Sequence, residues 1–233
     1  MKKLFLVLAV VSFMFMFPMY VSADIIGNVT LQLGYSSPTG VVTFPSESGN
    51  YYLDYDVRLN GGAWSEAFCV EDRDAPPSTT TYTLLSIDSS LSTFGLDAAS
   101  YLRAAWIADW FITNQPSSEA YKAGAQIAIW ENIFDASFNL SSGSFEAFSS
   151  NNAYTGEANE IWGLRPQAGF PTSSSTWALA VNPTVQQGGT VGSHEYQNYL
   201  VQYNRVPEPA TMLLLGIGLV VVGLAGTRRK FNK

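Results

Sequence analysis

The last 28 residues, Val206 to Lys233, constrain this chain more than any other stretch. Between Ala210 and Gly226 no residue is charged, and Thr211 carries the only polar side chain. As a helix this run would be about 25 Å long, slightly short of the roughly 30 Å hydrocarbon core of a bilayer, and its flanking residues can cover the difference. We therefore expect a membrane-spanning helix over about residues 210–227.

The charges around this run predict its orientation. Arg228, Arg229 and Lys230 follow it directly, whereas Glu208 precedes it. Positive charge on the C-terminal side alone predicts that the C-terminus lies in the cytoplasm and that the upstream chain lies outside. A helix buried in a soluble domain is the alternative, but such a helix would rarely sit at a chain end between a Pro-Glu-Pro sequence and a basic cluster.

The tail as a whole resembles a known sorting signal. Val206-Pro207-Glu208-Pro209, a short apolar helix and a terminal basic cluster are similar, in that order, to the PEP-CTERM signal. The resemblance implies that exosortase, a membrane protease, recognises and processes the tail near Pro-Glu-Pro. It also implies an exported protein of a Gram-negative bacterium that makes exopolysaccharide or biofilm. The precursor would then reside transiently in the inner membrane before reaching the cell surface or the extracellular matrix. A simple C-terminal anchor is the alternative.

The N-terminus predicts export as well. Lys2 and Lys3 precede an apolar stretch over residues 4–17, and Val21-Ser22-Ala23 offers the small residues that signal peptidase prefers. We expect a signal peptide over residues 1–23 with cleavage after Ala23. A retained signal anchor is the competing interpretation.

The two ends leave residues 24–205 as one β-rich extracellular domain, followed by the sorting signal at 206–233. The segment from Asp24 to Pro207 holds six basic and 18 acidic residues, a net charge of −12. Such a surface repels phosphate backbones, so nucleic acid is not expected as a partner. Cys69 is the one cysteine in the chain, which excludes an internal disulfide.

Alternating apolar residues predict strands in the first part of this domain. The expected strands cover residues 29–33, 41–44, 51–59, 64–70 and 82–87. Asn60-Gly61-Gly62 predicts a tight turn that makes a hairpin of the third and fourth. Further strands are expected at 177–181 and 196–203.

The middle of the domain has a helical period. Asp97 is a predicted N-cap for a helix to about Ile112, and Ser117 or Ser118 for a second helix to Phe134. Residues 140–175, rich in Ser, Asn and Gly, are expected to form a loop with short helical turns. The fold class is therefore α+β: an antiparallel sandwich or barrel-like domain with a two-helix insertion over about 97–135.

One pair of residues could carry chemistry. Cys69 lies in Phe68-Cys69-Val70 at the end of a predicted strand. Gln126 lies on the second helix, on the flank of its inward stripe, where it could face the sheet edge. These motifs resemble those of bacterial surface thioester domains. The resemblance implies that the Cys69 thiol and the Gln126 carboxamide condense with loss of ammonia, and that a partner amine, such as a lysine, then attacks the product. A thiol and a carboxamide more than about 8 Å apart would exclude this reaction, because near-attack geometry would be out of reach.

The alternative is structural. A free cysteine is usually a small buried hydrophobe, and a glutamine on a helix flank is usually solvated. Phe68, Trp106, Trp110 and Trp130 are the aromatic residues expected to exclude water from a thioester.

Other classes of function have weaker support. The acidic turn at 71–74 lacks the spaced ligands of a calcium loop, and no nucleophile–base set, metal-ligand spacing or phosphate loop occurs, so neither catalytic residues nor cofactors are expected. An exopolysaccharide ligand, a carbohydrate-active enzyme and a passive matrix protein remain alternatives.

Overall fold

The computed structural model describes residues 25–76, 79–114, 118–147, 152–182 and 196–203. The chain divides into two compact units, residues 1–202 and 203–233. The predicted signal peptide and its cleavage site at Ala23 lie outside the described residues, as does the predicted sorting signal. Within the described part, no helix combines the length and the apolar character needed to cross a membrane.

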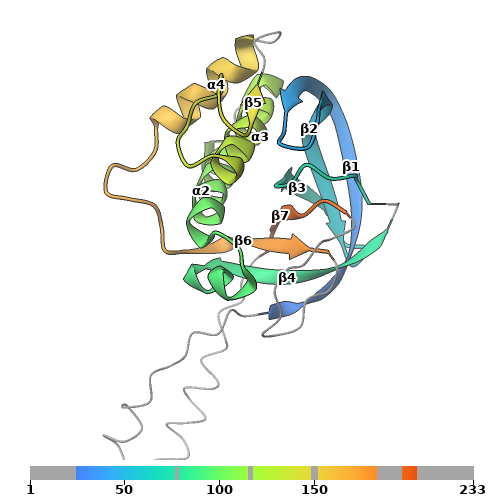
Figure 1. Cartoon of the computed structure of the whole chain (residues 1–233). Helices are drawn as coiled ribbons and strands as arrows, with labels where there is room; N and C mark the ends of the chain where they lie inside the picture. Colours follow the sequence, from blue (N-terminus) through green and yellow to red (C-terminus); the bar gives the residue numbers. More distant parts are fainter. Residues whose placement is uncertain (1–24, 77–78, 115–117, 148–151, 183–195, 204–233) are drawn as a thin grey trace, which may run out of the picture. The chain divides into compact units, whose positions relative to one another are not determined.

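Seven strands form one antiparallel sheet (Figure 1). They are β1 (Ile25–Thr43), β2 (Ser48–Leu59), β3 (Trp64–Cys69), β4 (Thr80–Asp88), β5 (Glu146–Ala147), β6 (Ser173–Val181) and β7 (Tyr199–Gln202). The order is β2-β3-β7-β6-β4-β1-β5, and β1 also pairs with β2. Because of that extra pairing, every strand except β5 has at least two neighbours, and the hydrogen bonding closes into a ring. The α+β class and the antiparallel pairing are confirmed, but the strands belong to one sheet and not to two packed sheets.

Strand β1 closes the ring because it is long enough to serve two partners. Its first part, from Ile25 to Leu31, pairs with β4, and its second part, from Leu31 to Thr43, pairs with β2. The register shifts between Ser36 and Thr39. The two short strands expected over 29–33 and 41–44 are thus parts of one strand.

The turn between β2 and β3 has the predicted geometry. Asn60 and Gly61 both have positive φ, 51° and 71°, which suits a two-residue hairpin turn. Asn60 Oδ1 also accepts a hydrogen bond from the Thr30 backbone N–H at 2.9 Å, which fixes the turn against β1.

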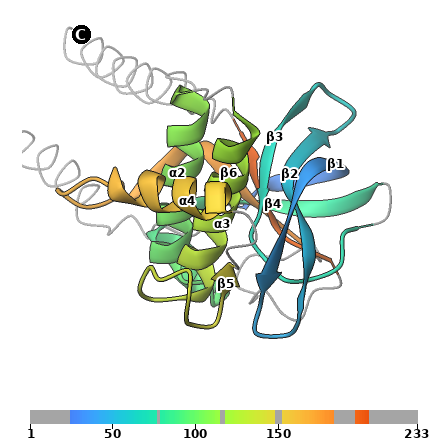
Figure 2. The ribbon, with the colours of Figure 1, turned by 90° about the horizontal axis from the view of Figure 1, so that it is seen from above.

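Four helices accompany the sheet: the 3-10 helix η1 (Ser89–Phe94), α2 (Ala98–Asn114), α3 (Glu119–Phe134) and α4 (Asn152–Gly163). Both expected N-caps are confirmed, since Asp97 accepts from the Ala99 N–H at 3.1 Å and Ser118 from the Ala120 N–H at 3.2 Å. Helix α2 packs against β6 and α3 against β2, while α4 packs on α3 (Figure 2).

Helix α4 corrects the expectation of a loop with only short helical turns over 140–175. Its twelve residues include Gly156 and several polar residues, so its sequence lacks a strong apolar stripe. Only Ala158 and Ile161 of α4 are fully buried. Packing on α3 stabilises this helix more than its own propensity does.

Candidate functional site

The site is built where β3 ends against α3. Strand β3 pairs with β2 from Trp64 to Ala67, and it then continues to Cys69 without a β2 partner. At Cys69 the side chain of Gln126 from α3 takes the position that a β2 residue would otherwise occupy. Its Oε1 accepts from the Cys69 backbone N–H at 3.0 Å, and its Nε2 donates to the Cys69 carbonyl at 2.8 Å. The carboxamide therefore supplies the pair of main-chain hydrogen bonds that a further β2 residue would have made to β3.

Gln126 and Cys69 are both completely buried. Gln126, expected on the flank of the inward stripe of its helix where it could face the sheet edge, lies in the interior against the end of β3. A buried main-chain N–H or C=O without a partner costs free energy, which explains why an amide is needed at this place. The chain thus brings together the two residues that the sequence singled out.

The Cys69 thiol donates to the Glu71 carbonyl oxygen at 3.1 Å. Burial raises the pKa of this thiol to about 12, an effect that a backbone hydrogen bond with Glu71 and the Trp130 indole partly offset. The thiol is therefore protonated at neutral pH. In this state the site holds a neutral nucleophile and a neutral carboxamide.

Trp130 places an unpaired donor beside the sulfur. Its indole N–H is buried and has no hydrogen-bond acceptor among the described residues. It nevertheless lowers the pKa of the Cys69 thiol, since a donor favours the negative form of sulfur. Such a group can stabilise charge that develops on the sulfur during a reaction.

Aromatic rings enclose the site on the sheet side. Tyr199 is the register partner of Cys69 in β7, and its ring lies 6.0 Å from that of Tyr55 and 6.2 Å from that of Tyr82. Phe68 and Trp130 are both fully buried. Trp106 and Trp110 do not take part, since they contact Phe170 and Tyr121 instead.

Lys122, one turn before Gln126 on α3, belongs to the site but was not predicted from the sequence. Its ammonium is buried, with Asp54 Oδ1 at 3.4 Å, the Glu66 carboxylate in direct contact and the Phe68 ring at 4.7 Å. Burial lowers the pKa of Lys122, and the charge of Asp54 opposes that shift. The signal was present in the spacing, because Lys122, Gln126 and Trp130 recur at i, i+4 and i+8 and so share one face of the helix.

The expected acidic turn after β3 has a structural role. Glu71 accepts from the Asn198 backbone N–H and side-chain amide, at 3.3 and 2.8 Å. Asp72 accepts from the Ser46 hydroxyl at 2.7 Å. These bonds tie the turn to β7 and to the β1–β2 loop. No group of residues suited to hold a metal ion occurs in the described part of the chain.

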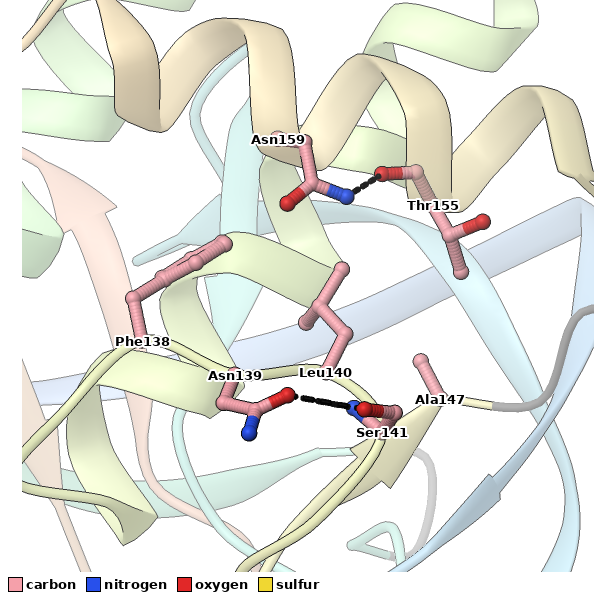
Figure 3. A pocket seen from close by; sticks show the side chains of 7 residues that line it. All are labelled: Phe138, Asn139, Leu140, Ser141, Ala147, Thr155 and Asn159. Carbon is pink, nitrogen blue, oxygen red and sulfur yellow. Dashed lines mark hydrogen bonds between the residues drawn. The ribbon is translucent and has the colours of Figure 1, made fainter.

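A separate pocket of about 320 Å³ lies between α4 and the segment after α3 (Figure 3). It is lined by Phe138, Asn139, Leu140, Ser141, Ala147, Thr155 and Asn159. Asn139 Oδ1 accepts from the Ser141 hydroxyl at 2.8 Å, and Asn159 Nδ2 donates to the Thr155 carbonyl at 2.7 Å. All seven lining side chains are uncharged, so the lining supplies no carboxylate, imidazole or amine.

The residues of the predicted sorting signal lie outside the described residues; they are Val206, Pro207, Glu208, Pro209, Arg228, Arg229 and Lys230. They fall within a segment that matches a known protein-sorting motif. The PEP-CTERM protein-sorting motif matches residues 205–230. No curated protein and no solved structure matches the chain. The motif implies that the chain is an exported, surface-directed protein processed by exosortase.

Proposed function

We propose that this protein is a covalent attachment protein of the cell surface or exopolysaccharide matrix, with an internal thioester between Cys69 and Gln126. The observation that carries the proposal is the direct pairing of the Gln126 carboxamide with the Cys69 main chain at 3.0 and 2.8 Å. Signal peptidase and exosortase would remove the two ends. The precursor would span the inner membrane transiently, with its C-terminus in the cytoplasm.

Proximity supports the reaction. The Cys69 sulfur is three bonds from its own nitrogen and therefore within about 4 Å of it. Since that nitrogen is 3.0 Å from Gln126 Oε1, the sulfur lies within about 7 Å of the carboxamide oxygen. Rotation about the Cys69 side chain, with loss of its bond to Glu71, would bring the sulfur towards Cδ. Because both groups belong to one folded chain, their reaction avoids the entropy cost of bringing two separate molecules together.

The surrounding donors match the charge that would develop. The Cys69 N–H already points at the Gln126 oxygen, which would become negative when sulfur attacks the carbonyl carbon. The Trp130 N–H lies beside the sulfur and would oppose the cost of charge on it.

The reaction balances without a cofactor. The sulfur forms a bond to Cδ of Gln126 as the Cδ–Nε2 bond breaks, and the thiol proton leaves with the nitrogen as ammonia. A partner amine then bonds to Cδ as the C–S bond breaks, and its proton returns to the Cys69 sulfur. Each domain reacts once, so the protein is not an enzyme.

Intact mass of the purified protein tests the proposal. Condensation lowers the mass by about 17 Da, and methylamine then raises it by about 31 Da. Trypsin would leave residues 59–73 joined to residues 123–205, because Cys69 and Gln126 lie in these two peptides and trypsin does not cleave the bond between Arg165 and Pro166. Cys69→Ala must abolish all three signals, and Cys69→Ser keeps the side-chain size as a second control. An unchanged wild-type mass would reject the thioester and leave Gln126 with a purely structural role.

A further inference from the structure

Lys122 is the only lysine between Lys3 and Lys230, and the domain buries it. Its side chain, on α3, is 6% exposed. Lysine is almost never buried to this degree unless it is paired. Burial lowers the pKa of Lys122, which increases the share of the uncharged, nucleophilic amine. The proposed thioester does not use this amine.

Two carboxylates from neighbouring strands face the amine of Lys122. The Glu66 carboxylate of β3 contacts Nζ directly, and Asp54 Oδ1 of β2 lies 3.4 Å from it. Asp54 Oδ2 accepts a hydrogen bond from the Ser36 hydroxyl at 3.1 Å, which fixes the orientation of this carboxylate. Asp56, the register partner of Glu66, lies two residues after Asp54 and shares its face of β2. One buried amine therefore lies within a group of three carboxyl groups.

Aromatic rings lie against the same amine. Nζ is 4.7 Å from the ring centroid of Phe68 and 5.3 Å from that of Phe111, and both rings are buried. The two rings contact each other edge to face, with centroids 5.9 Å apart. Apolar surroundings favour a neutral amine and a neutral acid over two separate charges. Burial likewise raises the pKa of Asp56, although the charge of Lys122 opposes this shift.

We propose that Lys122 and Asp54 join in an intramolecular amide bond, and that Glu66 transfers the protons. The ammonium of Lys122 first passes one proton to Asp54 through Glu66, which gives a free amine and a carboxylic acid. Nζ then bonds to Cγ of Asp54, a second proton passes through Glu66 to the departing hydroxyl, and the Cγ–O bond breaks. One water leaves, and no cofactor or oxidant takes part. The Asp54 side chain is 28% exposed, so this water can reach the solvent.

The geometry assigns different roles to the two carboxylates. Since Asp54 Oδ1 is 3.4 Å from Nζ, the carbon that bears it lies within about 5 Å, and a small side-chain rotation brings it into reach. The Ser36 hydroxyl can stabilise the negative charge that develops on the oxygen of Asp54. Glu66 already contacts Nζ, as a group that accepts its proton must.

The amide would tie α3 covalently to β2, one turn before Gln126. Such a cross-link stabilises a domain by constraining its unfolded state. It would form between two residues of the domain itself, without a partner molecule, and it does not depend on the proposed thioester.

Intact mass of the Cys69→Ala protein tests the inference, because this variant cannot form the thioester. We expect a mass about 18 Da below that of the unmodified chain, which hydroxylamine leaves unchanged. Trypsin should leave the peptide that ends at Arg58 joined to residues 104–205, because it does not cleave after an acylated Lys122.

Three variants in the same background complete the test. Lys122→Arg keeps the positive charge but must abolish both signals. Glu66→Gln should lower the cross-linked fraction of freshly purified protein at least about tenfold, because it removes the proton carrier. The matched control, Glu160→Gln at an exposed position of α4, should leave that fraction unchanged.

The possible results separate this inference from the thioester. An unmodified mass with normal cleavage after Lys122 overturns the amide and leaves Lys122 in a buried ion pair. A loss of about 18 Da that persists in Lys122→Arg also overturns it. Residues 104–205 joined to residues 59–73 would show that Glu66 is the acyl donor and overturn the assigned roles. A loss of about 17 Da that is seen only when Cys69 is present concerns the thioester alone.

Discussion

Removing the Gln126 carboxamide should destabilise the domain even when no thioester can form. The comparison is Cys69→Ala against Cys69→Ala/Gln126→Leu, because alanine keeps the main-chain N–H and C=O of residue 69 and removes the sulfur. In the double variant both groups would lose their partners inside a fully buried site. Each orphaned group costs about 1–3 kcal/mol, which gives roughly 2–6 kcal/mol in total.

The leucine side chain recovers part of that cost. An apolar group of similar size in a buried place contributes about 1–2 kcal/mol. We therefore expect the free energy of unfolding to fall by about 1–4 kcal/mol, a large share of the stability of a domain of this size. The assay is urea denaturation at pH 7, followed by tryptophan fluorescence.

The matched control is Gln167→Leu, which makes the same chemical change at an exposed position. It should change the free energy of unfolding by less than about 0.5 kcal/mol. If the Gln126 variant is equally mild, the carboxamide does not complete the β3 ladder, and the geometric basis of the proposed function is lost.

Three further predictions concern α3. Burial raises the pKa of Glu131 to about 7, so the folded state loses stability as pH rises from about 4.5 to 7. Glu131→Gln should therefore be more stable than wild type at pH 8 by about 1–3 kcal/mol. If urea denaturation shows the same stability difference between variant and wild type at pH 8 as at pH 4, the prediction is wrong. Gly124→Ala would place a Cβ 2.6 Å from a side-chain carbon of α4, so its melting temperature should fall, whereas Gly156→Ala meets nothing within 4 Å and should not lower it. Trp130→Phe removes the unpaired indole N–H and should slow the appearance of the thioester mass, while Trp162→Phe should not; equal rates would show that the indole plays no part.

Local patterns predicted most of the secondary structure. The helical period with a cap at Asp97 and another at Ser118 placed α2 and α3 within two residues of their ends. The alternation and the turn at Asn60 predicted the β2–β3 hairpin. These features depend on residues close together in the sequence, so a single chain suffices to read them.

The rest depends on contacts between distant segments. The ring closes because one strand, β1, pairs with both β2 and β4, and no residue pattern announces two partners. Helix α4 was missed because it depends on α3 for its stability. The position of Gln126 opposite Cys69 was expected from a resemblance, whereas its burial and its two hydrogen bonds depend on where β2 stops pairing with β3.

The hydrogen bond from Gln126 Nε2 to the Cys69 carbonyl has a consequence for the energetics of capture. Condensation in the proposed reaction would expel this nitrogen, so the thioester form would leave the Cys69 carbonyl oxygen in the protein interior with no donor. Attack by an amine would put an N–H back on the same carbon, and that hydrogen could bond to the Cys69 carbonyl oxygen again. The amide formed with a partner would therefore regain the hydrogen bond that the thioester form lacks. The amide-linked protein should then have a higher melting temperature than the thioester form.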